Sequence, residues 1–277
     1  MVDAKMSEAP YFYNTERPLV VAHRGALGHF PEESLASFVD AYYGGADFIE
    51  MDLQVTSDGY LICQHDPDLN ETTNILEYAN RFSDRERDDG KYYVSDFSLT
   101  EIRLLKRLAR SDKRSPVLND KFEVLTLEEI IEWVIMLNKD YPRELGNDSN
   151  YPVGLYIELK DYANNLNYLG VDMAEKMDSI LAHYGLNTVS DCTDKMPIIV
   201  QSFESGALDK YATLSDLPLI MLYNYHSGGE PDWEMFGQKY HGVGPDSQWV
   251  MNPTSYVTGP VSWDKSTAAN TYSNFIT

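Results

Sequence analysis

The sequence is poor in basic residues relative to its acidic content. Among its 277 residues, 22 are Lys or Arg and 44 are Asp or Glu, which gives a formal net charge of −22. Because the phosphates of DNA and RNA attract proteins with an excess of Lys and Arg, we expect no sequence-independent binding to nucleic acid. To bind an anionic small molecule, the protein would need a local cluster of basic residues that offsets the repulsion from its negative net charge.

Cysteines and long apolar runs are also scarce. The two cysteines, Cys63 and Cys192, provide neither a disulfide framework nor a metal knuckle. Cys63 lies inside an apolar strand-like run, so we expect it to be a buried free thiol. Since the sequence contains no run of about 18 apolar residues, we expect no membrane span. The oligomeric state stays open.

The start of the sequence lacks the apolar stretch of a signal peptide, and we treat residues 1–17 as an N-terminal extension. Either the protein stays inside the cell or a secretion signal is absent from this sequence. The Asn-X-Ser/Thr sequons at Asn70 and Asn147 favour the secretory or extracellular alternative. We expect residues 18–277 to form a single domain.

Short apolar, β-branched runs alternate with amphipathic helical stretches, which indicates an α/β fold with a parallel sheet. Expected helices begin with Ser or Thr caps followed three residues later by Glu, as in 98–108 and 126–137. A third helix is expected within 31–45. The expected strands are 19–23, 47–53, 60–65, 154–160, 197–203, 218–223 and 242–245.

Seven strands in alternation predict a (β/α)8 TIM barrel without an evident eighth strand, or an open doubly wound sheet. The open sheet is the weaker alternative, because no Gly-rich phosphate loop follows the first strand. After residue 245 the sequence contains no apolar run that could close the barrel. A polar stretch over about 67–95 interrupts the alternation, and we interpret it as an insertion.

Charged residues on the second expected strand indicate a metal site. Residues two apart on a strand face the same side, so Glu50 and Asp52 point together while Ile49, Met51 and Leu53 point to the opposite side. Neighbouring carboxylates repel unless a cation or a proton lies between them. A solvated edge strand is the alternative, but a hard divalent cation such as Mg²⁺ or Ca²⁺ agrees better with the wholly apolar opposite face.

Other strands end in residues suited to phosphoryl chemistry. His23 and Arg24 follow the first expected strand, His65 follows the third, and Glu158 and Lys160 end the fourth. In a barrel the carboxyl ends of the parallel strands meet on one face, where catalytic residues collect. Imidazoles transfer protons, a metal ion polarises a phosphoryl oxygen, and Arg and Lys neutralise charge.

These motifs, in this order, resemble the glycerophosphodiester phosphodiesterase family, most closely its eukaryotic, plant-type members. The similarity runs through AHRGALGHFPEESLASF, GADFIEMDLQVTSDGYLICQHD, GLYIELK, QSF and GVGP, over about residues 18–253. It implies a (β/α)8 barrel that hydrolyses a glycerophosphodiester with one divalent cation. Glu33 and Ser34 stand where many members have Asn and Thr, as in some plant-type sequences.

The resemblance also implies roles for individual residues. His23 and His65 correspond to the catalytic imidazoles, and Arg24 and Lys160 to cations beside the phosphate. Glu32 corresponds to a polar residue near the phosphate, and the metal ligands correspond to Glu50, Asp52 and Glu158.

Two alternatives remain beside hydrolysis of a deacylated substrate such as glycerophosphocholine. One is a lysophospholipase D-like or sphingomyelinase D-like activity on acylated phosphodiesters, which the polar insertion disfavours. The other is a degenerate barrel that binds a phosphate-bearing ligand without turnover. The absent eighth strand motivates it, whereas the full set of acid, base and ligand positions disfavours it.

Overall fold

The structure is a computed structural model that describes residues 19–110, 114–140, 152–223, 242–245 and 250–251. The expected N-terminal extension, the sequon at Asn147 and the tail after residue 251 lie outside the described residues. Within the described part of the chain, no helix has the length and apolar character needed to cross a membrane.

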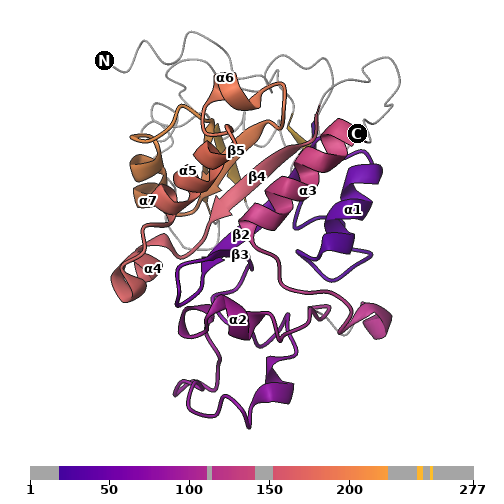
Figure 1. Ribbon diagram of the computed structural model, residues 1–277, viewed down its shortest axis with the longest axis vertical. Coiled ribbons are helices and arrows are strands. Elements are labelled where there is room, and N and C mark those ends of the chain that lie inside the picture. The colour runs from indigo at the N-terminus through magenta and orange to yellow at the C-terminus, as the bar shows by residue number, and fades with distance from the viewer. Residues whose placement is uncertain (1–18, 111–113, 141–151, 224–241, 246–249, 252–277) are drawn as a thin grey trace, which may run out of the picture.

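A curled parallel sheet forms the centre of the fold (Figure 1). Its strands follow the order β1-β2-β4-β5-β6-β7, and each neighbouring pair is parallel. The α/β class and the parallel sheet are thus confirmed, and these strands begin and end within two residues of the expected positions. Their bounds are β1 Leu19–Ala22, β2 Phe48–Val55, β4 Gly154–Leu159, β5 Ile198–Ser202, β6 Leu219–Tyr223 and β7 Gly242–Pro245.

The third expected strand does not belong to the parallel set. β3, Leu61–Cys63, pairs antiparallel with the end of β2. A tight turn causes this reversal: the Thr56 N–H donates to the Tyr60 carbonyl at 3.0 Å, and Gly59 adopts a positive φ of 83°. A parallel partner would require a crossover of a dozen or more residues, so the prediction that β3 continues the parallel alternation was wrong.

β8, Val250–Met251, pairs antiparallel with β1 and covers its outer edge. Within the described residues, no parallel eighth strand follows β7. The short β8 protects the edge of β1, where unpaired backbone groups would otherwise be exposed.

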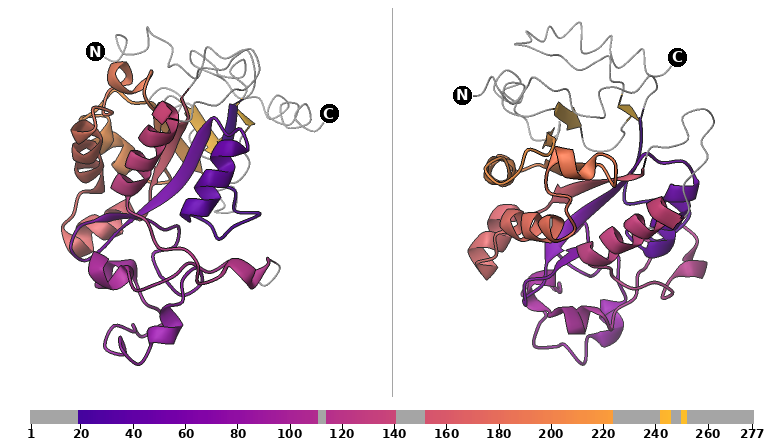
Figure 2. Two further views of the ribbon diagram at one scale, coloured as in Figure 1. Left: turned by 45° about the vertical axis from the view of Figure 1, so that its right-hand side comes forward. Right: turned by 45° about the horizontal axis from the view of Figure 1, so that its top comes forward.

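Helices cover the outer face of the sheet (Figure 2). Outward side chains of β2 and β4, such as Ile49, Met51 and Ile157, join buried residues of these helices in the largest apolar core. Ser34 caps the first helix by accepting the Ser37 N–H, and this helix lies within the expected range 31–45. The helices are α1 Leu35–Tyr43, α3 Leu127–Asp140, α4 Tyr162–Leu169, α5 Met173–His183, α6 Val189–Cys192 and α7 Ser205–Tyr211.

The insertion lies beyond the carboxyl end of β2 and has an apolar core of its own, which includes Ile75, Phe82 and Phe97 (Figure 1). The expected helix over 98–108 is much shorter: Ser98 and Glu101 form the predicted capping box, but α2 ends at Ile102. Irregular structure therefore continues past the expected boundary at residue 95. Its short elements are η2 Ile75–Tyr78, η3 Val94–Asp96, α2 Leu99–Ile102 and η4 Pro116–Leu118.

Candidate active site

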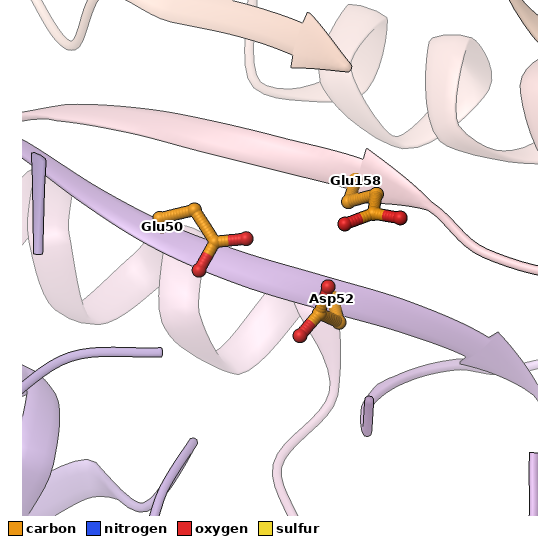
Figure 3. Close-up of side chains that lie close together, drawn as sticks. All are labelled: Glu50, Asp52 and Glu158. Carbon is orange, nitrogen blue, oxygen red and sulfur yellow. The ribbon is translucent and has the colours of Figure 1, made fainter. Parts of the chain in front are cut away.

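Three carboxylates converge inside the sheet near its carboxyl edge (Figure 3). Glu50 and Asp52 lie on the inner face of β2, and the register of β4 places Glu158 directly beside Asp52. Each residue offers an oxygen, and these oxygens all lie within 4.8 Å of one another. All three side chains are buried. The structure thus brings together the three residues that the sequence predicted as metal ligands.

The protonation of this triad reflects the crowding of its charges. Burial and the nearby charge of Asp52 raise the pKa values of Glu50 and Glu158 well above their usual range. For Asp52, burial opposes ionisation, but Lys160, His65 and Arg24 together outweigh it and lower the pKa. Asp52 is therefore readily ionised, whereas ionisation of Glu50 and Glu158 is unfavourable unless a further cation is bound.

The donor set of the triad fits a hard divalent cation. All the offered atoms are carboxylate oxygens, which Mg²⁺ and Ca²⁺ prefer, and among the described residues no His or Cys completes the cluster. Both carboxylate oxygens of Asp52 are buried without a hydrogen bond from any described residue. Asp52 is therefore held by its ion pairs with Arg24 and Lys160, and its oxygens stay available for direct ligation of a cation.

Two basic side chains border the triad, as the sequence predicted. Arg24 places its Nε 3.1 Å from Asp52 Oδ2, and its backbone N–H donates to Glu50 Oε2 at 2.7 Å. The Lys160 Nζ lies 3.1 Å from Glu158 and 3.6 Å from Asp52. These cations lie at the rim of the acidic cluster, where an anionic substrate group would approach it.

Both predicted histidines reach the same edge of β2 from opposite directions. Ala22 pairs with Ile49 on parallel β1, so His23 lies level with Glu50. The antiparallel β3 brings Gln64 opposite Asp52, where its N–H donates to the Asp52 carbonyl at 2.9 Å, and His65 follows directly. The reversal of β3 therefore returns His65 to the triad.

Glu33 fills the gap that β1 and β3 leave along this edge of β2, a role that the sequence did not reveal. Its Oε1 accepts the Asp52 backbone N–H at 2.8 Å, and the residue is fully buried. Burial and Asp52 raise the pKa of Glu33 well above its usual range. The Arg107 guanidinium, also fully buried, lies 3.8 Å away and is held by Gln64 and the Cys63 carbonyl.

The turn after β1 depends on unusual backbone conformations. Arg24 and Gly25 both have positive φ, at 54° and 76°. A Cβ atom at Gly25 would lie 2.8 Å from the backbone carbon of Ser37, so a larger residue would push the turn away from α1. The glycine of the HRG motif is thus required to bring Arg24 against Glu50.

Gln201 and Arg110 also contact the site, although neither was predicted. The Gln201 amide donates to Glu50 Oε1 at 3.0 Å across the sheet interior. Arg110, which follows α2, binds Glu32 through Nε and a terminal nitrogen at 2.9 and 2.7 Å. Glu32 is buried and also accepts from Arg24 at 3.1 Å. Glu32 therefore lies between two guanidinium groups.

Comparison with known proteins agrees with this geometry. A family model described as "Glycerophosphoryl diester phosphodiesterase family" matches residues 23–253. The glycerophosphodiester phosphodiesterase GDPD6 of Arabidopsis thaliana is 32% identical over 75% of this chain and 56% of its own length. The glycerophosphodiester phosphodiesterase of Haemophilus influenzae is 30% identical over 84% and 61%, respectively. The chain thus spans less than two thirds of the length of either relative.

Solved structures support the fold. A phosphodiesterase from Oleispira antarctica, described in complex with the product sn-glycerol-3-phosphate, aligns with a TM-score of 0.56 at 21% identity. The alignment covers 83% of this chain and 75% of that chain. The predicted (β/α)8 barrel class is confirmed by this likeness.

Proposed function

Since this chain belongs to the glycerophosphoryl diester phosphodiesterase family, we propose that it hydrolyses glycerophosphodiesters, such as glycerophosphocholine, to sn-glycerol 3-phosphate and an alcohol. The observation that carries the proposal is the buried triad of Glu50, Asp52 and Glu158, with imidazoles and cations at its rim. The product described for the Oleispira antarctica phosphodiesterase supports the same product class here.

In this proposal Glu50, Asp52 and Glu158 hold one divalent cation, Mg²⁺ or Ca²⁺. A cation bound there would polarise a phosphoryl oxygen of the substrate. Arg24 and Lys160 neutralise the remaining phosphate charge from the rim of the triad, at 3.1 Å from Asp52 and Glu158 respectively.

His23 and His65 exchange protons with the reacting groups. One accepts a proton from the attacking nucleophile, a water or the glycerol hydroxyl of the substrate, while the other protonates the leaving alcohol as its bond to phosphorus breaks. If the glycerol hydroxyl attacks, a water then opens the resulting cyclic phosphodiester to give sn-glycerol 3-phosphate. The Nδ1 of His65 lies 2.7 Å from Asp66 Oδ1. Because a carboxylate only accepts, Nδ1 carries the hydrogen and Nε2 is the atom available for proton transfer.

Glu32, proposed from the sequence as a polar residue near the phosphate, acts through Arg24 in this scheme. An ionised carboxylate would repel a phosphate, whereas its contact with Arg24 at 3.1 Å fixes a phosphate-binding cation. Burial opposes ionisation of Glu32, but the hydrogen bond from Arg110 and the charges of Arg24 and Arg110 lower its pKa.

A pocket beside Asp66 supports a deacylated substrate. Five charged or polar side chains and one proline line it, which suits a polar alcohol better than an acyl chain. Its lining consists of Asp66, Pro67, Asp68, Glu71, Lys91 and Tyr93.

The test is the release of sn-glycerol 3-phosphate from glycerophosphocholine with added Mg²⁺ or Ca²⁺ and again with chelator. We expect chelator-sensitive release, and its loss in Glu50→Ala and His23→Ala. His183→Ala is the matched control, because this exposed histidine ends α5 outside the predicted motifs. Full activity in either site variant would contradict the proposal.

Two other outcomes identify the alternatives. Faster turnover of lysophosphatidylcholine than of glycerophosphocholine would favour the lysophospholipase D-like activity. Thermal stabilisation by the metal ion without turnover of any phosphodiester would favour a barrel that only binds a phosphate-bearing ligand.

A further inference from the structure

We propose that Arg110 is a positioning residue that fixes both the acid-base histidine His65 and the phosphate-binding residue Arg24. This inference deepens the proposed function and rests on it for the roles of His65 and Arg24. Arg110 reaches neither of them directly. It binds Asp66, which holds His65, and Glu32, which holds Arg24.

Each nitrogen of the Arg110 guanidinium contacts a carboxylate. Nε and one terminal nitrogen bind the carboxylate of Glu32 at 2.9 and 2.7 Å. The other terminal nitrogen lies 2.6 Å from Asp66 Oδ2 and 3.2 Å from Glu71. A planar guanidinium meets this arrangement, whereas an ammonium group cannot. Because each nitrogen already faces a carboxylate, Arg110 acts through these residues rather than as a phosphate contact.

One branch of this network ends at His65. Asp66 shares its two oxygens, Oδ1 with His65 Nδ1 at 2.7 Å and Oδ2 with Arg110 at 2.6 Å. Burial opposes ionisation of Asp66, but the hydrogen bonds with His65 and Arg110 lower its pKa to about 2. Asp66 therefore stays a hydrogen-bond acceptor, which selects the Nδ1–H tautomer of His65 and points Nε2 away from Asp66.

The other branch ends at the acidic triad. Arg110 and Arg24 both bind Glu32, and Arg24 lies 3.1 Å from Asp52. Glu32 precedes α1, Asp66 follows β3 and Arg110 follows α2, so the three residues come from separate loops. An isolated antiparallel β-bridge between Thr73 and Arg107 joins the segment after β3 to the segment after α2 and holds Arg110 beside Asp66. The bonds of Arg110 to Glu32 connect these two segments to the loop before α1 and make the segment after α2 part of the site.

The experiment compares Arg110→Gln with Arg85→Gln as a matched control. Arg85 is also half-buried and binds one carboxylate, Glu101, with two nitrogens at 3.2 and 3.1 Å, but it touches none of the catalytic motifs. The first measurement is kcat and KM for glycerophosphocholine with saturating metal ion. The second is the long-range ¹H–¹⁵N NMR spectrum of the histidine rings at about pH 8, where a free imidazole is neutral. His65→Gln assigns the relevant signals.

For Arg110→Gln we expect a fall in kcat of roughly 10- to 100-fold, with KM changed less than about threefold. The His65 signals should move from a single Nδ1–H tautomer to a mixture. Arg85→Gln should retain the wild-type kcat and His65 spectrum. The kcat of Arg110→Lys should lie between those of the wild type and Arg110→Gln. If Arg110→Gln does not fold, Arg110→Lys takes its place in both measurements.

An unchanged His65 spectrum in Arg110→Gln would overturn the inference, and so would a kcat within about threefold of that of Arg85→Gln. Failure of the proposed function has a different signature, because the wild type and Arg85→Gln would then release no product. The ring spectrum does not depend on turnover, so it tests the inference in that case too.

Discussion

The inner face of the sheet contains two layers that differ in chemistry but share the same strands. Towards the amino ends, Phe48, Tyr156, Ile199 and Ile220 form a small apolar cluster. Two residues further along β2, β4 and β5, and on the same face of the sheet, lie three buried polar residues, Glu50, Glu158 and Gln201.

Because side chains two residues apart on a strand point to the same face, the apolar cluster and the polar layer lie next to each other on the same strands. If the proposed function holds, the amino-end layer supplies stability and the carboxyl-end layer supplies chemistry. Substitutions in each layer should therefore affect different quantities.

The largest effect is expected for Glu50→Gln. Loss of one ligand carboxylate should lower kcat/KM at least about a thousandfold, which corresponds to about 4 kcal/mol of transition-state stabilisation. In chelator the melting temperature should stay equal or rise, because the raised pKa of Glu50 shows that its charge opposes folding. Steady-state kinetics and melting curves measure the two quantities. Glu123→Gln, which removes an exposed carboxylate that pairs with Lys106, is the control.

A pair of variants on β5 compares the layers directly. Ile199→Ala creates a cavity in the apolar cluster and should lower the free energy of unfolding by about 2–5 kcal/mol, with kcat retained. Gln201→Ala, two residues further on the same face, removes the donor to Glu50 and should lower kcat roughly 10- to 100-fold. Urea denaturation and kinetics measure both variants. A larger loss of kcat in Ile199→Ala than in Gln201→Ala would contradict the division into layers.

The sequence predicted the parallel strands and the charged face of β2 because both depend on local patterns, whereas Glu158 joined the predicted metal ligands through the family resemblance. Apolar residues on one face of β2, with Glu50 and Asp52 on the other, indicate a buried strand that carries charge. The orientation of β3 was predictable too, since the turn at residues 56–60 is too short for a parallel crossover. Counting apolar runs alone concealed this reversal.

The supporting residues were not predictable, because their partners are distant in the sequence. Glu33, Arg110 and Gln201 contact carboxylates or backbone groups 19, 78 and 151 residues away, respectively. Glu33 and Gln201 lie in stretches that carry the family resemblance, but the local sequence does not identify their partners, and Arg110 lies outside those stretches. The overestimated helix over 98–108 has a related cause, since Arg107 leaves the helical path and is buried against Gln64.

The third prediction concerns pH and the metal ion. The raised pKa values of Glu50 and Glu158 mean that the metal-free folded protein retains protons that the unfolded chain releases. Above the usual pKa of glutamate, the unfolding free energy of the metal-free protein should therefore fall as pH rises.

Metal binding displaces these protons from Glu50 and Glu158, so the affinity for the metal ion should increase with pH, about tenfold per pH unit for each proton displaced. Calorimetric titration with Ca²⁺ between about pH 5 and 8 measures this, and Glu123→Gln should show the same slope.

The smallest effect is expected at the boundary between the layers. Ile220 on β6 pairs in register with Gln201 but belongs to the apolar cluster. Ile220→Val removes one methylene and should lower the unfolding free energy by about 1 kcal/mol, with kcat within about twofold of wild type. Urea denaturation and kinetics at saturating metal ion measure the two effects. A large loss of kcat would mean that packing beside Gln201 holds the amide against Glu50, so that the apolar layer also positions the site.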